Sequence, residues 1–497
     1  MIPRPGVPAG GFQSDVVAVV RTPLFQFIAA TAVGTLILFA RAPAAAVSPV
    51  LFAEDWHWTS MVMTRGFWDT ALHARDDYHI LGNVALIWGA IQLAERVVGD
   101  VFAIPQCLAM VSYAFFAATA ALPLLLLRRQ LPAAYRWAAW LLVCLMPLGI
   151  HAPPYWSGFE ILGRAVNAGF AFLFIAFVLL WYRASAVHTF AQAVPVDLAL
   201  LACTATNPLC IPMLTAATWP AARRWLVDRV PAARLVREGA FVSLCLLAVA
   251  CVALNGLPAS RPPHVIEPAP PVSPAAAVEI GVARGLLYPL VWPFYRRLSE
   301  WSTLAVAAGA LAVTIRWGQP RHRPLVAAGL ATVGLVSVVL VLRRGELAAY
   351  LDGYRSTFPD RYFLGQNLVA TLMVVVFAAD VAERLRGCGR RAWLPMACLL
   401  GLATAAAVHE PPWRIAPSQF LVSADDAVEI TAIRSCRARW FVDATCARHP
   451  EGRFVAISVP RLSAAPLLLP RDSVERSLAR RGERRRLLAA RPSSPRL

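Results

Sequence analysis

The residues best suited to chemistry are an adjacent acidic pair, Glu54 and Asp55, placed shortly after a first apolar segment. A carboxylate that is partly desolvated at a water–lipid boundary has a raised pKa, which lets it accept a proton from a hydroxyl group. We therefore predict Asp55 as a general base. Glu54 either shares a divalent cation with Asp55 or is simply solvated, since no fixed metal-ligand spacing decides between the two.

The pair belongs to a polar stretch, 41–100, in which charged and aromatic side chains are interleaved. Such mixtures are typical of the headgroup layer of a membrane, so a solvated interfacial belt is the simpler interpretation of any one residue. Three residues of the stretch are also candidate substrate contacts: His57, Tyr78 and His79. We interpret its tryptophans as interface anchors rather than platforms for sugar rings: Trp56, Trp58 and Trp68.

The composition indicates what kind of fold positions these residues. Hydrophobic residues make up 58% of the 497 residues and charged residues only 15%, whereas soluble domains carry about 25% charged residues. The mean hydropathy is +0.57. We predict an all-α polytopic membrane protein. Its net charge of +18 is spread over loops and a tail, which favours contact with anionic lipid over nucleic acid.

Apolar runs long enough to cross a bilayer, about 17 to 25 residues, recur along the chain. We predict about nine crossings within a transmembrane domain that covers residues 1–408. They lie near residues 24–40, 101–127, 135–150, 164–182, 239–256, 301–315, 324–342, 363–379 and 392–408. No cleavage-site pattern precedes the first crossing, so we expect it to remain as an anchor.

One apolar stretch, 196–219, is expected to enter the membrane without crossing it. Asn207-Pro208 divides the stretch into two halves, each of about a dozen residues and too short to span. Arginines precede and follow it, so both of its ends can lie on the cytoplasmic side. We predict a re-entrant helical hairpin.

The other arginine clusters orient the remaining segments by the positive-inside rule. They place the N-terminus in the cytoplasm and the loops 41–100 and 257–300 outside it, together with the C-terminal segment. We interpret 80–98 as an interfacial amphipathic helix, because it is apolar but carries polar residues. These are Asn83, Gln92, Glu95 and Arg96. If 80–98 crosses instead, every later loop changes side.

The C-terminal region is expected to lie outside the membrane. Alternating apolar residues predict a small unit with some β-structure over 409–470. An Arg- and Ser-rich composition predicts a disordered tail over 471–497. Most of the ten cysteines lie in apolar runs, but Cys436 and Cys446 could form a disulfide in an oxidising compartment.

The pattern Phe52-Ala-Glu-Asp55, soon after the first crossing, resembles the acidic motif of GT-C-type membrane glycosyltransferases. In these proteins a sugar passes from a polyprenyl-phosphate carrier to an acceptor outside the cytoplasm. The resemblance implies such an activity in a bacterial inner membrane, with an envelope glycan or lipid as acceptor. It also implies that Asp55, with Glu54 as second choice, acts as base or helps to bind a metal.

Two further stretches carry the resemblance, which covers residues 22 to about 410. Asn207-Pro-Leu-Cys-Ile-Pro212 resembles a short helical hairpin with a central proline, and Pro359-Asp-Arg-Tyr-Phe363 resembles the Arg-Tyr sequence at the start of a late helix. The resemblance implies that Arg361 and Tyr362 contact the donor phosphate, a role that suits guanidinium. Arg343 and Arg344 are further candidates for that role. The stretch after Tyr78 departs from the family pattern because it has no nearby arginine.

Two other classes of function stay open. Ion-coupled transporters usually keep ionisable groups at the membrane midplane, and the predicted crossings have none at their centres. A lipid or solute flippase with a polar groove needs none. The third class is a non-catalytic subunit of an envelope assembly system. It would be indicated if Asp55→Asn leaves every phenotype intact while deletion of the tail does not.

Overall fold

The computed structural model describes residues 22–47, 54–75, 78–148, 161–186, 189–214, 232–255, 272–343, 347, 354, 360–409, 454–457, 467–477 and 479–480. Helices of the first half, with 3-10 and π-helical segments marked η, are α2 (Pro23–Arg41), α3 (Ala44–Val47), α4 (Glu54–Arg65), α5 (Phe67–His73), α6 (Leu81–Gln92), η1 (Leu93–Val98), η2 (Val101–Ala103), α7 (Ile104–Leu126), α8 (Ala133–Leu145), η3 (Ala168–Ala171), α9 (Phe172–Ala186), α10 (Phe190–Thr204) and η4 (Pro208–Cys210).

The second half continues with helices and ends in a hairpin. Its helices are α12 (Ala232–Asn255), α13 (Pro274–Ile280), η5 (Gly281–Leu287), α14 (Tyr288–Val291), η6 (Trp292–Arg297), α15 (Glu300–Trp317), α16 (Arg323–Arg343), η8 (Asp360–Phe363), α18 (Leu364–Gly387) and α19 (Leu394–His409). Strands β1 (Phe454–Ile457) and β2 (Leu467–Pro470) pair antiparallel, with Phe454 opposite Pro470.

Six helical segments of the described chain are long and apolar enough to cross a membrane. They are Pro23–Arg41, Leu81–Val98, Val101–Leu126, Ala168–Ala186, Pro274–Arg297 and Leu325–Leu342. Four of them coincide with predicted crossings, and the prediction of an all-α, multi-pass membrane protein is confirmed. The other two, Leu81–Val98 and Pro274–Arg297, fall in stretches that we predicted as parts of outer loops.

The membrane bundle is built on the contact between α2 and α7. A side chain at Gly34 of α2 would meet the Ala117 methyl of α7 at 3.0 Å, so the two backbones approach closely. Small residues permit this approach where no water is available to drive apolar burial. Ala30, Leu38 and Ala120 belong to the same large core, into which α8, α9 and α18 also pack.

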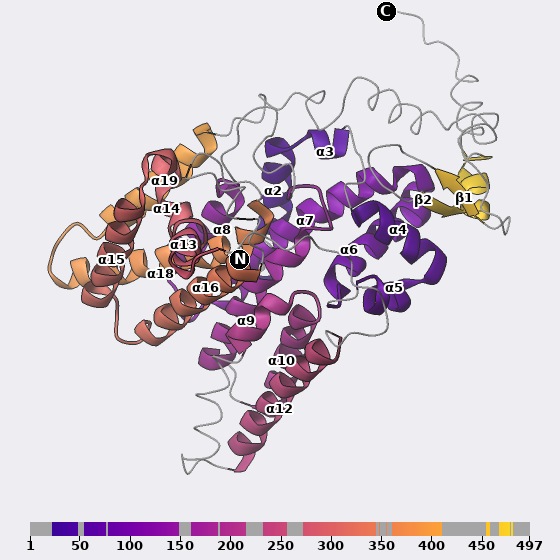
Figure 1. The fold of residues 1–497 in the computed structure, drawn as a ribbon. Coiled ribbons are helices and arrows are strands. Elements are labelled where there is room, and N and C mark those ends of the chain that lie inside the picture. Colours follow the sequence, from indigo (N-terminus) through magenta and orange to yellow (C-terminus); the bar gives the residue numbers. More distant parts are fainter. Residues whose placement is uncertain are drawn as a thin grey trace, which may run out of the picture.

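A second core lies beside the first and contains the helix of Asp55 (Figure 1). In this core α6 packs on the N-terminal part of α7, as the burial of Ile87 and Ile104 shows. The C-terminal part of α7, from Ala109 onward, packs instead against α2. The helices α4, α5 and α6 therefore form a separate layer at the end of the bundle, which we call the Asp55 layer. Leu81–Val98 has the length and apolar composition of a crossing, so our interpretation of 80–98 as an interfacial amphipathic helix stays a prediction.

Trp56 and Trp58 are not interface anchors, contrary to our interpretation, because only 4% and 3% of their surfaces are exposed. They fill the second core. Trp68 is exposed over 68% of its surface, as an anchor requires. Trp56 and Trp58 lie about 200° apart around α4, and both are buried because most of the circumference of this helix is covered, which the mixed composition of the stretch concealed.

The C-terminal segment covers the Asp55 layer. The Leu468 amide of β2 donates to Ser60 Oγ of α4 at 2.9 Å, and Ser473 Oγ donates to Glu95 at 2.7 Å. Leu469 and Val474 are buried in the second core. Residues 471–477, which we predicted as the start of a disordered tail, are helical. The described tail residues and the Asp55 layer therefore lie on one side of the bundle.

The segment Pro274–Arg297 cannot be a straight crossing. Tyr354 donates a hydrogen bond to Glu279 at 2.5 Å, and its ring centroid lies 5.5 Å from that of Tyr295. A straight helix would separate Glu279 and Tyr295 by about 24 Å, too far for one tyrosine to contact both. The π-helical turn η5 and the prolines at 289 and 293 supply the bend.

The helix break predicted at Asn207-Pro208 is present. Helix α10 ends at Thr204, and Asn207 caps η4 by accepting a hydrogen bond from the Leu209 amide at 3.0 Å. Residues 215–219, the end of the predicted hairpin, lie outside the described residues, as do Arg344, Cys436 and Cys446. Arg343 is the last residue of α16, and its side chain is likewise outside the described part.

Candidate functional site

Asp55 is fully buried at the start of α4, where the Asp55 layer meets the bundle. Its Oδ1 accepts a hydrogen bond from the Val166 amide at 2.6 Å. Its Oδ2 is buried and has no hydrogen-bond partner among the described residues. A buried carboxylate normally has both oxygens satisfied. Within the described part of the chain, Asp55 thus has one oxygen held by a backbone amide and the other without a hydrogen bond.

The surroundings of Asp55 favour its protonated form. Burial raises the pKa of the carboxyl to about 7, and the Arg164 guanidinium and the amides of Val166 and Ala165 only partly oppose this rise. The charge of Glu54 adds a small further rise. A carboxyl with a pKa near the working pH is suited to exchanging protons with a substrate.

Arg164 is the charged residue that faces Asp55, and sequence reasoning missed it. Only 4% of its surface is exposed, and burial lowers the pKa of its guanidinium while the Asp55 carboxylate opposes that fall. Gly163, immediately before it, adopts φ +75°, a conformation that L side chains rarely adopt. The turn at Gly163 thus helps to set Arg164 next to Asp55.

The segment 161–171 is the element that brings the site together. Asn83 of α6 donates from its amide nitrogen to the carbonyls of Ala165 and Val166, at 2.7 and 2.8 Å. Asn207 donates to the Gly169 carbonyl at 3.0 Å. Two polar residues that we noted only as interruptions of apolar stretches therefore fix the backbone that binds Asp55. Their partners lie 82, 83 and 38 positions away in the chain, so no local pattern indicates them.

Two of the predicted phosphate contacts, Arg361 and Tyr362, lie in η8, which the same segment contacts through Phe170. The ring of Phe170 in η3 meets the ring of Tyr362 in η8 edge to face, with centroids 5.4 Å apart. Arg361 is half-buried, and its guanidinium carbon lies 5.0 Å from the Tyr362 ring centroid. Tyr362 is 9% exposed. The segment 161–171 therefore contacts both the carboxylate and the Arg-Tyr pair that the resemblance singles out.

The remaining predicted residues lie away from the Asp55 carboxylate. Glu54 and His57 are exposed on α4, since neighbouring helix positions point about 100° apart. The Arg75 guanidinium covers the Tyr78 ring at 4.5 Å, and His79 Nδ1 lies 3.3 Å from the Leu72 carbonyl. The acidic pair does not present two carboxylates to one ion, and the described residues include no group of three His, Cys, Asp or Glu side chains that could hold a metal.

The structure also contains a buried ion pair next to η8 that the sequence analysis did not identify. Arg284 of η5 is 1% exposed, and its Nη2 lies 3.1 Å from Oδ1 of Asp360, the residue before Arg361. Its guanidinium carbon is 4.2 Å from the Tyr288 ring centroid and 5.1 Å from that of Phe363. This pair fixes η8 to the bent segment 274–297 and so helps to position Arg361.

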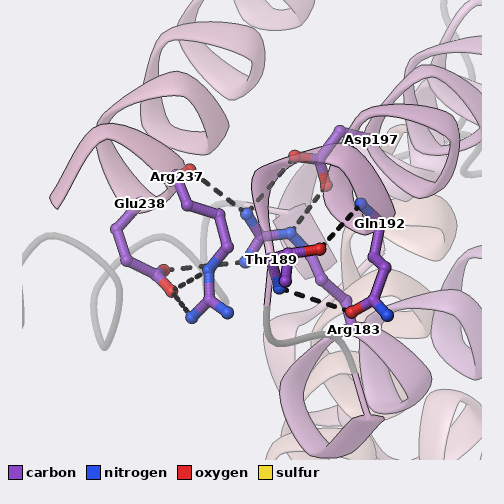
Figure 2. Close-up of polar contacts among 6 residues, drawn as sticks. All are labelled: Arg183, Thr189, Gln192, Asp197, Arg237 and Glu238. Carbon is purple, nitrogen blue, oxygen red and sulfur yellow. Dashed lines mark hydrogen bonds and ion pairs between the residues drawn. The ribbon is translucent and has the colours of Figure 1, made fainter. Parts of the chain in front are cut away.

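Four buried charges join three helices elsewhere in the bundle (Figure 2). Arg183 of α9 lies 2.6 Å from Asp197 of α10 and 3.6 Å from Glu238 of α12. Arg237 lies 2.5 Å from Glu238. The two positive and two negative charges balance, so the network can stay buried without a ligand. We interpret it as a clamp that holds α10 and α12 on α9.

The described geometry thus unites a half-satisfied carboxylate, its arginine and an Arg-Tyr pair around one segment. Comparison with known proteins adds no relative to this description: no protein-family model matches the chain, and no curated protein matches it.

Proposed function

We propose that this chain is a GT-C-type membrane glycosyltransferase with Asp55 as its general base. The observation that carries the proposal is the Asp55 carboxyl, which has one free oxygen among the described residues and a pKa of about 7. A structural aspartate would be expected to use both oxygens. A base for a sugar hydroxyl needs an oxygen that is held in position but not consumed by the protein.

In the proposed reaction Asp55 Oδ2 takes the proton from the acceptor hydroxyl as the acceptor oxygen attacks the anomeric carbon. The bond between that carbon and the phosphate oxygen breaks, and polyprenyl phosphate leaves with the electron pair. Arg361 offsets the negative charge of the leaving phosphate, with Tyr362 beside it. Because Asp55 is closed off from solvent, the acceptor reaches it when the Asp55 layer shifts relative to the segment 161–171.

The proposed location is a bacterial inner membrane, with the N-terminus in the cytoplasm and the Asp55 layer outside. The contact between β2 and α4 supports placing the described tail residues on the same side as Asp55. The arginine clusters support the opposite end of the bundle as cytoplasmic. The donor would be a polyprenyl-phosphate-linked sugar, and the acceptor an envelope glycan or lipid.

The test uses the full chain in nanodiscs with a panel of undecaprenyl-phosphate-linked hexoses and pentoses and an envelope extract as acceptor. Release of undecaprenyl phosphate is measured for wild type, Asp55→Asn and Asp69→Asn. We expect loss of about 100-fold or more for Asp55→Asn. The exposed Asp69 lies in the same layer and pairs with His73 of its own helix at 2.9 Å, so its variant should match wild type. Equal rates for all three proteins would reject Asp55 as the base.

A transporter is the second candidate, favoured by the buried Arg284–Asp360 pair. The predicted crossings have no ionisable groups at their centres, but the segment 274–297 was not among those predicted crossings. Paired charges inside a membrane bundle often mark a substrate path. Movement of a fluorescent lipid across proteoliposomes, abolished by Arg284→Ala and unaffected by Asp55→Asn, would favour the transporter over the transferase.

A further inference from the structure

A cavity that the proposed function does not use lies at the C-terminal end of α18. Segment η8 precedes the other end of this helix. The volume of the cavity is about 250 Å³. The α7–α8 connection, the α15–α16 connection and the last turns of α18 line it, through residues that include Gln130, Tyr135, Arg321, His322, Asp380 and Arg386. The space is large enough for a phosphate group together with a small attached polar group.

Two polar side chains in the lining, the buried His322 and the partly buried Gln130, each have an atom available to a ligand. His322 Nδ1 lies 2.7 Å from Asp380 Oδ1, and Asp380 Oδ2 accepts the Gln319 amide at 2.9 Å. This contact fixes the imidazole ring and leaves Nε2 as the atom a ligand can reach. One end of the Gln130 amide bonds to Ser185 Oγ at 2.5 Å, and the other end is buried without a partner among the described residues.

The charges around the cavity favour an anion. Ten arginines and two acidic residues occur in the three stretches that line or flank it, 128–136, 316–323 and 380–391. Arg321 pairs with Glu383 at 2.6 Å, and Asp380 is engaged by His322. Arg386 lines the cavity, is exposed, and forms no ion pair within the described part of the chain. Basic pockets between membrane helices commonly receive lipid phosphates.

We propose that this cavity binds a phosphate-bearing ligand, with Arg386 and His322 facing the phosphate and Gln130 facing a hydroxyl or ammonium group attached to it. A phospholipid headgroup and a free phosphate compound share this chemistry. The site is separate from Asp55, because α9 begins beside the segment 161–171 and reaches Ser185, the partner of Gln130, only near its far end. Its failure would leave the proposed transferase untouched.

The experiment measures binding of phosphatidylglycerol to the full-length protein by native mass spectrometry, with diacylglycerol as the phosphate-free control lipid. Arg386→Ala removes the proposed contact, and Arg390→Ala removes the same charge from an exposed residue outside the lining. Loss of a hydrogen bond to a charged group weakens affinity by about tenfold. We expect that loss for Arg386→Ala and no change beyond about twofold for Arg390→Ala. Ala379→Leu, which places bulk in the lining, tests occupancy without altering charge.

A second arm adds inorganic phosphate at millimolar concentration. Displacement of phosphatidylglycerol would assign the site to phosphate from either source, and retention would assign it to the lipid headgroup. Both results support a phosphate site. Equal weakening by Arg386→Ala and Arg390→Ala, or equal binding of diacylglycerol, would overturn it in favour of general attraction to an arginine-rich surface. So would unchanged binding in both Arg386→Ala and Ala379→Leu.

Discussion

Two buried aspartates at opposite ends of the bundle differ in how many of their carboxylate oxygens have hydrogen-bond partners. Asp380 uses both oxygens, one toward His322 and one toward the Gln319 amide. Asp55 uses one oxygen toward the Val166 amide and leaves the other without a partner in the described chain. Both side chains are nearly inaccessible, at 1% and 0% exposure.

The difference separates a carboxylate that organises structure from one that is suited to reaction. Polar contacts to both oxygens offset the free-energy cost of burying the Asp380 charge. At Asp55, where one oxygen has no hydrogen bond from the described residues, more of that cost remains, and the pKa rises to about 7. Burial alone therefore does not distinguish the two aspartates, whereas their hydrogen bonds do: of the two, only Asp55 keeps an oxygen without a partner among the described residues.

The largest expected effect is on Asp380. Asp380→Ala removes the partner of a buried imidazole and of a backbone amide, which should destabilise the protein by about 3 to 5 kcal/mol. Asp380→Asn keeps an acceptor for the Gln319 amide and should lose less. The melting temperature in detergent measures both. If Asp380→Ala melts like wild type, Asp380 does not hold the α15–α16 connection to α18.

The second effect depends on pH and concerns Asp55. Its folded pKa of about 7 lies above 3.8, the ordinary value for an aspartate, so the folded state keeps a proton that the unfolded state loses between these values. Stability therefore falls as pH rises from about 4 to about 7, by as much as about 4 kcal/mol. Asp55→Asn removes this titration but keeps an acceptor for Val166. As pH rises across that range, the melting temperature of the variant should increase relative to that of wild type. If the melting temperatures of the two proteins change in parallel with pH, the raised pKa is contradicted.

A smaller effect is expected from the segment that holds Asp55. Asn83→Ala removes two hydrogen bonds to backbone carbonyls and should cost about 1 to 3 kcal/mol. Faster amide hydrogen exchange at 161–171, with unchanged exchange at 319–323, would show that the loss is local. Equally faster amide hydrogen exchange at 161–171 and at 319–323 would mean that Asn83 supports the whole bundle rather than the Asp55 site.

The smallest effect concerns the cover of the Asp55 layer. Ser60→Ala removes the acceptor of the Leu468 amide, which should cost about 1 kcal/mol. Thr64→Ala is the matched control, because the Thr64 hydroxyl bonds only within α4. Limited proteolysis after residue 454 should be faster in Ser60→Ala than in Thr64→Ala. The same cleavage rate in both would argue against a docking role for Ser60.

Much of the fold follows from local patterns, whereas the site does so only in part. Long apolar runs predicted α2, α7, α9 and α16, because hydrophobic length is visible in any short window. The bend in 274–297 was missed: the π-helical turn η5 and the prolines at 289 and 293 supply it, but the contacts of Tyr354 that reveal it join residues distant in sequence. Asp55 could be predicted from its type and place, but its contact with Val166 spans 111 positions. Arg164 and Asn83 gain their roles only through such distant partners.

The cover over α4 has a consequence for how the protein is made. Ser60 and Leu468 are 408 positions apart, and ribosomes add about 5 to 20 residues per second. The helix of Asp55 therefore exists for roughly 20 to 80 s before the strand that covers it has been synthesised. During that interval the second core lacks Leu469 and Val474. Completion of the Asp55 layer is thus one of the last events of biogenesis, and a nascent chain arrested before residue 467 would display α4 uncovered.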